Sequence, residues 1–338
     1  MCVEMSQQHR WLAELNCREG LLELEKKDFY WKECGFEGEV RFAKLAEKAS
    51  EPGWQWLFDL RLQTKAGEIQ LDAVLICEAG WFCFEVKNYR ANYQFSDNRM
   101  VVNGVPKYHD AFRQVERSRS IFDKIAGGFS GVGAGKYYVV FINEADSVEV
   151  SEGVSDIPYI KNAKLQGFFQ DLRYKCQKVS HLREVLRRDF DEEARQLRAM
   201  HEGDSRRYSL TEERFVSLRK GLYCEQCSSF DVEVTRYYVV CRGCGFCEGK
   251  EKASLRLVCA LGTLLPYERL RPYKVWQLGG GMLGLKSIRI VMSKNCTQNG
   301  MESSFKNTNQ SFNKQFGHLD FRYKDKYLLS KINQRKLP

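Results

Sequence analysis

Two apolar runs in the first third of the chain have the residue pattern of neighbouring strands. Residues 69–76 read Ile-Gln-Leu-Asp-Ala-Val-Leu-Ile, and residues 81–87 read Trp-Phe-Cys-Phe-Glu-Val-Lys. The Glu-Ala-Gly segment at residues 78–80 predicts a turn between them. We therefore expect these two runs to form a hairpin that carries Asp72 on one strand and Glu85 on the other.

The register of this hairpin brings charged side chains together. With a loop over residues 77–80, Asp72 faces Glu85. Opposed side chains lie about 4.5–5.5 Å apart at Cβ, so two carboxylates there repel each other unless a cation or a proton intervenes. Strand periodicity also places Lys87 on the same face as Glu85. One face then holds two carboxylates and an ammonium, as metal-assisted hydrolysis of a phosphodiester requires.

Helical and strand patterns alternate over the first 200 residues. Residues 5–32 predict one or two amphipathic helices that pack on the next domain, and residues 35–48 predict the start of another helix, which Pro52-Gly53 ends. Further strands are predicted at 54–63, 92–102 and 136–143, and further helices at 109–126, 163–175 and 179–200. This order predicts a mixed α/β sandwich whose core ends near residue 200.

Composition narrows the class of protein. The chain has 43% hydrophobic residues, six prolines and no long biased tract, which favours folded domains over disorder. No apolar run approaches the roughly 20 residues of a membrane span, and residues 1–11 lack a signal-peptide core. We therefore expect a cytoplasmic protein without a membrane partner.

Charge is distributed unevenly along the chain, whose formal net charge is +9. Residues 250–338 hold 17 Lys and Arg against 5 Asp and Glu, whereas the preceding 249 residues hold 36 against 39. A basic terminal segment of this kind is either a solubility feature or a contact for a polyanion.

Cysteine spacing predicts a metal site. Thirteen cysteines is an odd number, in a chain larger than those that usually depend on a disulfide framework, so we expect reduced thiols. Cys224 with Cys227 and Cys241 with Cys244 form two Cys-x-x-Cys pairs separated by thirteen residues, a spacing typical of a tetrahedral Zn²⁺ site. The segment resembles a zinc ribbon. A redox role and a second pair formed by Cys244 and Cys247 are the alternatives.

The order of charged residues in the first domain resembles a known family. Gly38-Glu39, Gln70-Leu71-Asp72 and Phe84-Glu85-Val86-Lys87-Asn88-Tyr89 are together similar to the nuclease-related domain (NERD), a branch of the PD-(D/E)xK nuclease superfamily. The resemblance covers roughly residues 30–150. It departs from the family at Leu71, where isoleucine is more frequent, and at His109-Asp110, where proline is frequent.

This resemblance implies a catalytic site that uses Mg²⁺ or Mn²⁺. Asp72 and Glu85 would each give the metal one carboxylate oxygen, and the backbone carbonyl of Val86 would be a third ligand. Lys87 would orient a water molecule and stabilise developing negative charge.

Two further residues are expected to support the site. Glu39 would complete the outer shell or hold Lys87, and Gln114, on the next helix, would contact the DNA backbone or the water. Each candidate taken alone has an ordinary structural explanation, such as a solvated helix residue or a cross-strand ion pair. A degenerate nuclease that binds without cutting is a further alternative.

The basic C-terminal segment carries weaker signals. Residues 283–292 resemble a short recognition helix after a glycine turn, as in a helix-turn-helix, or form an ordinary helical core with a basic face. Aromatic residues are interleaved with the charges, which suits stacking on bases: Phe305, Phe312, Phe316, Phe321, Tyr323 and Tyr327.

Together these patterns predict a restriction-endonuclease-like mixed α/β sheet flanked by helices, followed by a small zinc ribbon and a basic, mainly helical domain. The expected boundaries are 1–29 for an N-terminal helical segment, 30–200 for the nuclease-like domain, 201–220 for a linker, 221–250 for the ribbon and 251–338 for the last domain. The expected function is metal-dependent hydrolysis of DNA, with RNA as an alternative substrate. The alternatives are a DNA-binding or complex-assembly protein with an unused nuclease fold, and a partner that uses the ribbon for protein contact.

Overall fold

The structure, a computed structural model of the chain, divides into two compact units that are described separately. It describes residues 3–65, 67–96, 99–107, 110–129, 135–145, 147–185, 188–202, 208–297 and 304–306. Unit 1 comprises Met1–Glu4 and Trp31–Ser205, and unit 2 comprises Met5–Tyr30 and Arg206–Pro338. The division falls within helix α2, Glu23–Ala49.

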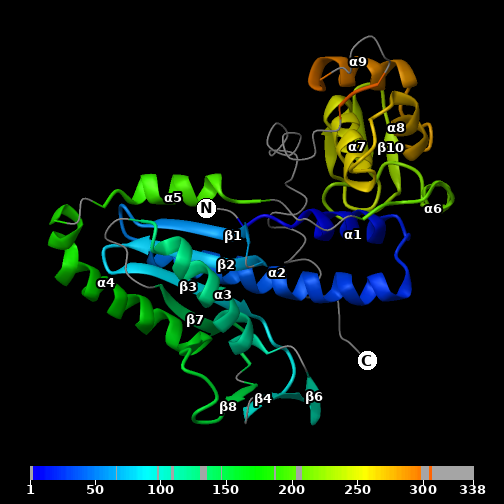
Figure 1. Cartoon of the computed structure of the whole chain (residues 1–338). Coiled ribbons are helices and arrows are strands. Elements are labelled where there is room, and N and C mark those ends of the chain that lie inside the picture. Colours follow the sequence, from blue (N-terminus) through cyan, green and yellow to red (C-terminus); the bar gives the residue numbers. More distant parts are fainter. Residues whose placement is uncertain are drawn as a thin grey trace. The chain divides into compact units, whose positions relative to one another are not determined.

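Unit 1 is built on a five-stranded sheet of order β1-β2-β3-β7-β9 (Figure 1). Its strands are β1 (Gln55–Thr64), β2 (Gly67–Cys77), β3 (Gly80–Lys87), β7 (Lys136–Phe141) and β9 (Tyr159–Lys161). β1, β2 and β3 pair antiparallel, whereas β7 and β9 are added in parallel, so the sheet is mixed. A second sheet has the order β6-β5-β4-β8 and contains β4 (Tyr93–Ser96), β5 (Arg99–Val102), β6 (Val105–Lys107) and β8 (Val148–Val150).

Helices cover both faces of the five-stranded sheet. Helices α3 (Ala111–Ala126) and α5 (Phe190–Ala199) share a core with one face, and α2 and α4 (Asn162–Val185) share a core with the other. Because successive strand residues point to opposite faces, Val74 of β2 lies in the first core and Leu75 in the second. The prediction of a mixed α/β fold with helices on its sheet is confirmed.

The β2–β3 hairpin has the predicted register. Ile76 pairs with Trp81, as a loop over residues 77–80 requires. The turn is tighter than predicted, because Cys77 also pairs with Gly80 and leaves two residues between them. Gly80 has a φ of 109°, a conformation that side-chain-bearing residues rarely adopt, which explains the glycine at this turn.

Helix α2 is longer than the pattern predicted. Residues 35–48, expected to start a helix, are instead the second half of Glu23–Ala49. The helix continues through Gly38. Glycine at this position lets the helix lie close to Asn88, because a Cβ there would be 2.6 Å from Cβ of Asn88. The helix pair expected at 163–175 and 179–200 also has other bounds, because α4 runs on to Val185 and α5 begins after the Asp189 cap.

Unit 2 combines helices with a small sheet. Its helices are α1 (Gln7–Cys17), α6 (Glu212–Ser217), α7 (Lys250–Leu264), α8 (Pro272–Leu278) and α9 (Leu285–Asn295), and its antiparallel strands are β10 (Val232–Val234), β11 (Tyr238–Cys241) and β12 (Cys247–Gly249). The Trp11 indole N–H donates to the Leu264 carbonyl at 3.2 Å, within the contact between α1 and α7.

The first helix therefore packs on a segment far along the chain, helix α7. An apolar helix face shows that the helix is buried but not what buries it. Within the described parts of the chain, every helix is too short or too polar to cross a lipid bilayer.

Candidate functional site

Two buried carboxylates lie on adjacent strands of the five-stranded sheet. Asp72 is 9% exposed and Glu85 is 4% exposed. The register that pairs Ala73 with Phe84 places Asp72 and Glu85 opposite each other at the next step. The Val86 backbone N–H donates to Asp72 Oδ2 at 2.8 Å, which fixes that carboxylate against β3.

Lys87 lies on the same side of β3 and connects this pair to helix α3. Its Nζ is 2.5 Å from Glu85 Oε1 and 3.1 Å from Gln114 Oε1, and its side chain is 22% exposed. Gln114 is placed by the start of α3, where the Asp110 carboxylate accepts the Phe112 N–H at 2.8 Å. Gln114 thus contacts the ammonium of Lys87, and Asp110 caps the helix that carries Gln114.

Glu39 approaches the pair from helix α2. Its side chain is half-buried, and burial, followed by the charges of Asp72, Asp59 and Glu85, raises its pKa well above the ordinary value. The structure therefore brings Glu39 together with the two sheet carboxylates. Its approach depends on the Gly38 contact, because α2 must lie close to Asn88, which directly follows strand β3.

Asp59 is a fourth carboxylate that we did not predict. It interrupts β1 with a φ of 49° and occupies the position opposite Asp72, between two paired residues. Gln70 Nε2 donates to its Oδ1 at 2.7 Å, and Arg61 Nε lies 3.3 Å from the same oxygen. Burial raises the pKa of Asp59, and the charge of Asp72 adds to the effect. The signal in the sequence was one acidic residue within an apolar strand.

The four carboxylates together carry more negative charge when ionised than the neighbouring cations Lys87 and Arg61 neutralise. Burial, and then the charge of Asp72, raises the pKa of Glu85 to about 7. Burial also raises the pKa of Asp72. Burial opposes the charged form of Lys87, but the carboxylates of Glu85 and Asp72 outweigh it and raise the pKa of the ammonium. The excess charge favours uptake of a proton or of a divalent cation.

The donor set fits a hard cation such as Mg²⁺ or Mn²⁺, because its side-chain donors are carboxylate oxygens. Among the described residues, groups of three or more side-chain donors within 4.8 Å of one another occur at two other places but not here. The arrangement therefore fits two carboxylates, Asp72 and Glu85, with Glu39 further out. A backbone oxygen and water would complete such a shell.

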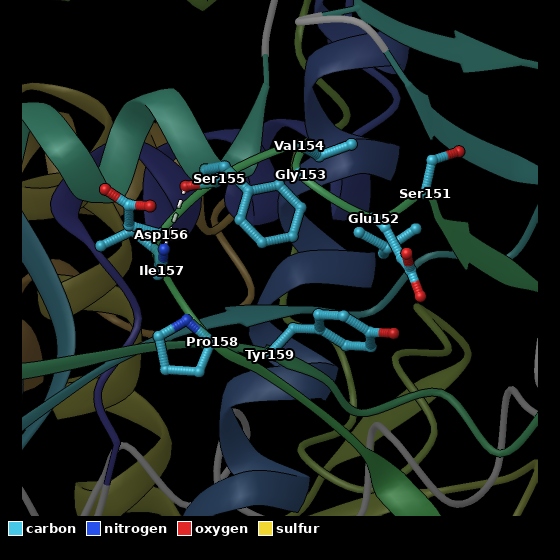
Figure 2. Close-up of a pocket in the computed structure, with 11 residues that line it drawn as sticks. Ser151, Glu152, Gly153, Val154, Ser155, Asp156, Ile157, Pro158 and Tyr159 are labelled. Atoms are coloured by element: carbon cyan, nitrogen blue, oxygen red, sulfur yellow. Dashed lines mark hydrogen bonds between the residues drawn. The ribbon is translucent and has the colours of Figure 1, made fainter.

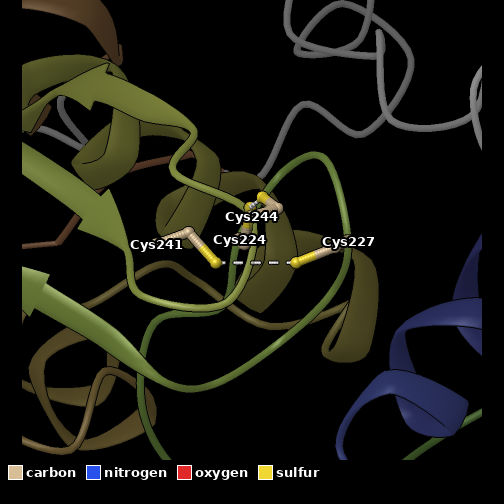
Figure 3. A group of neighbouring side chains, drawn as sticks. All are labelled: Cys224, Cys227, Cys241 and Cys244. Carbon is tan, nitrogen blue, oxygen red and sulfur yellow. Dashed lines mark hydrogen bonds between the residues drawn. The ribbon is translucent and has the colours of Figure 1, made fainter.

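The second candidate site is a cluster of four cysteines in unit 2. Sγ atoms of Cys224, Cys227, Cys241 and Cys244 all lie within 4.8 Å of one another (Figure 3). Two Sγ–Sγ distances, Cys224–Cys244 and Cys227–Cys241, are 3.5 Å. Cys247 pairs with Val240 in the small sheet and is not part of the cluster.

Backbone amides point at the sulfurs. The Gln226 N–H lies 3.3 Å from the Cys224 Sγ. Although burial opposes it, N–H groups of Cys244 and Gly243 together with the Cys227 thiol lower the pKa of Cys241 to about 7. Four converging sulfurs with amide donors can bind Zn²⁺ as thiolates.

A buried polar network fixes the chain just before the first cysteine pair. Tyr223 Oη donates to Glu14 Oε2 at 2.8 Å, and Arg18 Nε donates to Glu14 Oε1 at 2.9 Å. Arg256 donates to the Tyr223 carbonyl at 2.7 Å and pairs with Glu248. Because Tyr223 precedes Cys224, helices α1 and α7 together position the cysteine cluster.

Helix α9 presents a basic outer face. Lys286, Arg289 and Lys294 are exposed, whereas Ile288 and Met292 are buried, and Leu285–Asn295 contains no acidic residue. The helix predicted over residues 283–292 is therefore present.

The aromatic residues of the C-terminal segment are described only in part. Phe305, expected among the stacking aromatics, is instead buried and bridges to Leu270. It therefore cannot stack on a base. The other five aromatics, Phe312, Phe316, Phe321, Tyr323 and Tyr327, lie outside the described residues.

A pocket of about 380 Å³ in unit 1 is lined by residues that belong to neither cluster (Figure 2). Residues 150–159 and Phe112 line it, and they include the carboxylates of Glu152 and Asp156 but no lysine or arginine. A pocket lined in this way does not favour a phosphate group. It does provide, in exposed Glu152, a carboxylate outside the candidate site.

Comparison with known proteins gives one family match. Residues 34–142, about a third of the chain, match the model of NERD, described as a nuclease-related domain. No curated protein and no solved structure matches the chain. The matched segment contains the four carboxylates, Lys87 and Gln114, and it ends before the cysteine cluster. These findings support a nuclease-related domain in unit 1.

Proposed function

We propose that this chain is a metal-dependent nuclease that hydrolyses phosphodiester bonds of DNA at the carboxylate cluster of unit 1. The observation that carries the proposal is the buried pair Asp72 and Glu85 with Lys87 beside it, inside a segment that matches a nuclease-related domain. The mixed sheet with helices on both faces suits a restriction-endonuclease-like fold, which is the architecture that we propose for unit 1.

The residues of the chain have distinct roles in this proposal. A Mg²⁺ ion held by Asp72, Glu85 and the Val86 carbonyl would neutralise charge on the phosphate and acidify a water molecule. The Val86 N–H holds Asp72 in place. Lys87, fixed between Glu85 and Gln114, would orient the attacking water and stabilise negative charge on the phosphate. Glu39 would bind water in the outer shell.

Unit 2 would bind the nucleic acid. The four cysteines would hold Zn²⁺ in a zinc ribbon, and the exposed face of α9 would contact the phosphate backbone through Lys286, Arg289 and Lys294. The absence of acidic residues from α9 supports this role.

A second candidate function is DNA binding without cleavage. One observation favours it: Glu39 does not join Asp72 and Glu85 in a group of donors within 4.8 Å, among the residues that the structure describes. In that case Lys87 and Glu85 would serve as a structural ion pair.

Cleavage of plasmid DNA with Mg²⁺ or Mn²⁺ distinguishes the two functions. The assay compares the unaltered chain with Asp72→Ala, Lys87→Ala and the control Glu152→Gln. We expect cleavage by the unaltered chain and the control, with losses of about 10²–10³-fold or more in the two site variants. DNA binding without cleavage by the unaltered chain would support the second function. If the unaltered chain neither cleaves nor binds DNA, both functions are contradicted.

A further inference from the structure

A second group of metal-type ligands lies in unit 1, away from the carboxylate cluster. Cys77 and Cys176 are buried, and their Sγ atoms are 3.5 Å apart. A carboxylate oxygen of Glu78 lies within 4.8 Å of both sulfurs. Cys77 follows Asp72 by five positions along β2, which corresponds to roughly 17 Å. The group is therefore distinct from the candidate nuclease site.

The fold brings these residues together from two places in the chain. Cys77 ends β2 and faces the core shared with α4, from which Cys176 projects. Glu78 begins the hairpin turn and is half-buried. The ligands therefore join the tip of a hairpin to helix α4, in which Cys176 lies 99 positions after Cys77.

Neighbouring groups hold this arrangement in place. Trp54 Nε1 donates to Glu78 Oε2 at 3.0 Å, which orients the carboxylate. Arg188 Nη1 donates to the Cys77 carbonyl at 2.9 Å, and the same guanidinium pairs with Glu193. In metal sites the ligand side chains are typically also held by hydrogen bonds, as Glu78 is here by Trp54.

The cysteine cluster of unit 2 provides an internal standard for the sulfur geometry. Two of its Sγ–Sγ distances are 3.5 Å, equal to that of Cys77 and Cys176. Two thiolates bound to one tetrahedral Zn²⁺ at about 2.3 Å lie about 3.8 Å apart, whereas disulfide sulfurs lie about 2.05 Å apart. The observed separation is close to the value for a shared metal.

We propose that Cys77, Glu78 and Cys176 bind one Zn²⁺ ion, with water as the fourth ligand. Two sulfurs and one carboxylate select a softer ion than Mg²⁺, and three protein ligands with one open position are a known zinc arrangement. Binding releases two thiol protons to solvent and leaves both sulfurs as thiolates. The ion clamps the β2–β3 turn to α4.

Metal counting tests this site without reference to nuclease activity. The full chain is purified under reducing conditions, equilibrated with Zn²⁺, freed of excess metal and measured for zinc per chain. We expect about two zinc ions in the unaltered chain and in the control Cys296→Ser. We expect about one in Cys176→Ser, in Glu78→Gln and in Cys241→Ser, the last because it disrupts the other cluster.

Cobalt resolves the two sites spectroscopically. In the Cys241→Ser chain, the remaining Co²⁺ should show thiolate-to-metal charge-transfer absorption, and a further Cys176→Ser change should abolish it. Glu78→Gln keeps both thiols, so it tests the site even where loss of a buried cysteine disturbs folding.

Two results would overturn the proposal. One is a zinc count that is the same in the unaltered chain, Cys176→Ser and Glu78→Gln. The other is an intact mass that shows a covalent Cys77–Cys176 bond in the purified protein, with no cobalt absorption after its reduction.

Discussion

The carboxylate cluster of unit 1 and the cysteine cluster of unit 2 differ in how the fold holds their side chains together. The cysteine sulfurs converge from two short motifs, and backbone N–H groups already point at them. The carboxylates come from three strands and a helix, repel one another and include Glu85, whose pKa is about 7. We expect a metal to complete the cysteine cluster as part of the fold, whereas the carboxylate cluster is held together by packing and destabilised by like charges.

The largest expected effect follows from removing the cysteine site. Cys227→Ser should abolish zinc binding at the cysteine cluster and unfold much of unit 2, because structural zinc sites contribute about 10–16 kcal/mol of binding free energy. Hydrogen exchange measured by mass spectrometry should show lost protection in peptides from residues 208–297 and retained protection in peptides from residues 54–87. Cys296→Ser is the control.

Equal loss of protection in both groups of peptides would contradict the comparison. So would full protection of residues 208–297 in Cys227→Ser, because the fold around the cysteine cluster would then not depend on its metal.

The same contrast explains what the sequence could predict. The β2–β3 hairpin and the two Cys-x-x-Cys pairs are local, so strand periodicity and spacing place Asp72, Glu85 and the four cysteines correctly with respect to their neighbours. The approach of Glu39 was implied only by family resemblance. It depends on tertiary packing, in which Gly38 lets helix α2 come close to Asn88.

Other features could not be predicted, because the pattern of apolar residues shows which side chains are buried but not which residues they pack against. Asp59 reaches the cluster through a left-handed backbone conformation within a strand, which its residue type does not specify. Helix α1 has an ordinary apolar face, yet it packs on α7, where the contact of Trp11 with Leu264 joins residues 253 positions apart. Cys77 and Cys176 likewise meet only after the sheet and α4 have formed.

A smaller effect is expected in the pH dependence of stability. With the pKa of Glu85 raised from 4.5 to about 7, the folded chain keeps a proton between these values that the unfolded chain has released. Without metal, the contribution of Glu85 to the free energy of unfolding should therefore fall by about 1–3 kcal/mol as pH rises from about 4.5 to about 7, and then stay level. Denaturant titrations at several pH values measure this.

Glu85→Gln tests the origin of that slope. The amide resembles the protonated acid, so the variant should lose this part of the pH dependence and be more stable than the unaltered chain at pH 8 without metal. Mg²⁺ should stabilise the unaltered chain more at pH 8 than at pH 5.5, and should stabilise the variant little. A less stable variant at pH 8 would show that the Lys87 contact outweighs carboxylate repulsion.

The smallest expected effect distinguishes the positioning of the Lys87 ammonium from the effect of its charge. Gln114→Ala removes the neutral acceptor that holds Lys87 Nζ at 3.1 Å but leaves the ammonium beside Glu85. A hydrogen bond of this kind contributes about 1 kcal/mol, so DNA cleavage should fall about fivefold, with Mg²⁺ affinity unchanged. Gln114→Glu offers an acceptor again but adds negative charge, so it should raise Mg²⁺ affinity without restoring the rate. A loss as large as that of Lys87→Ala would instead place Gln114 in contact with the substrate.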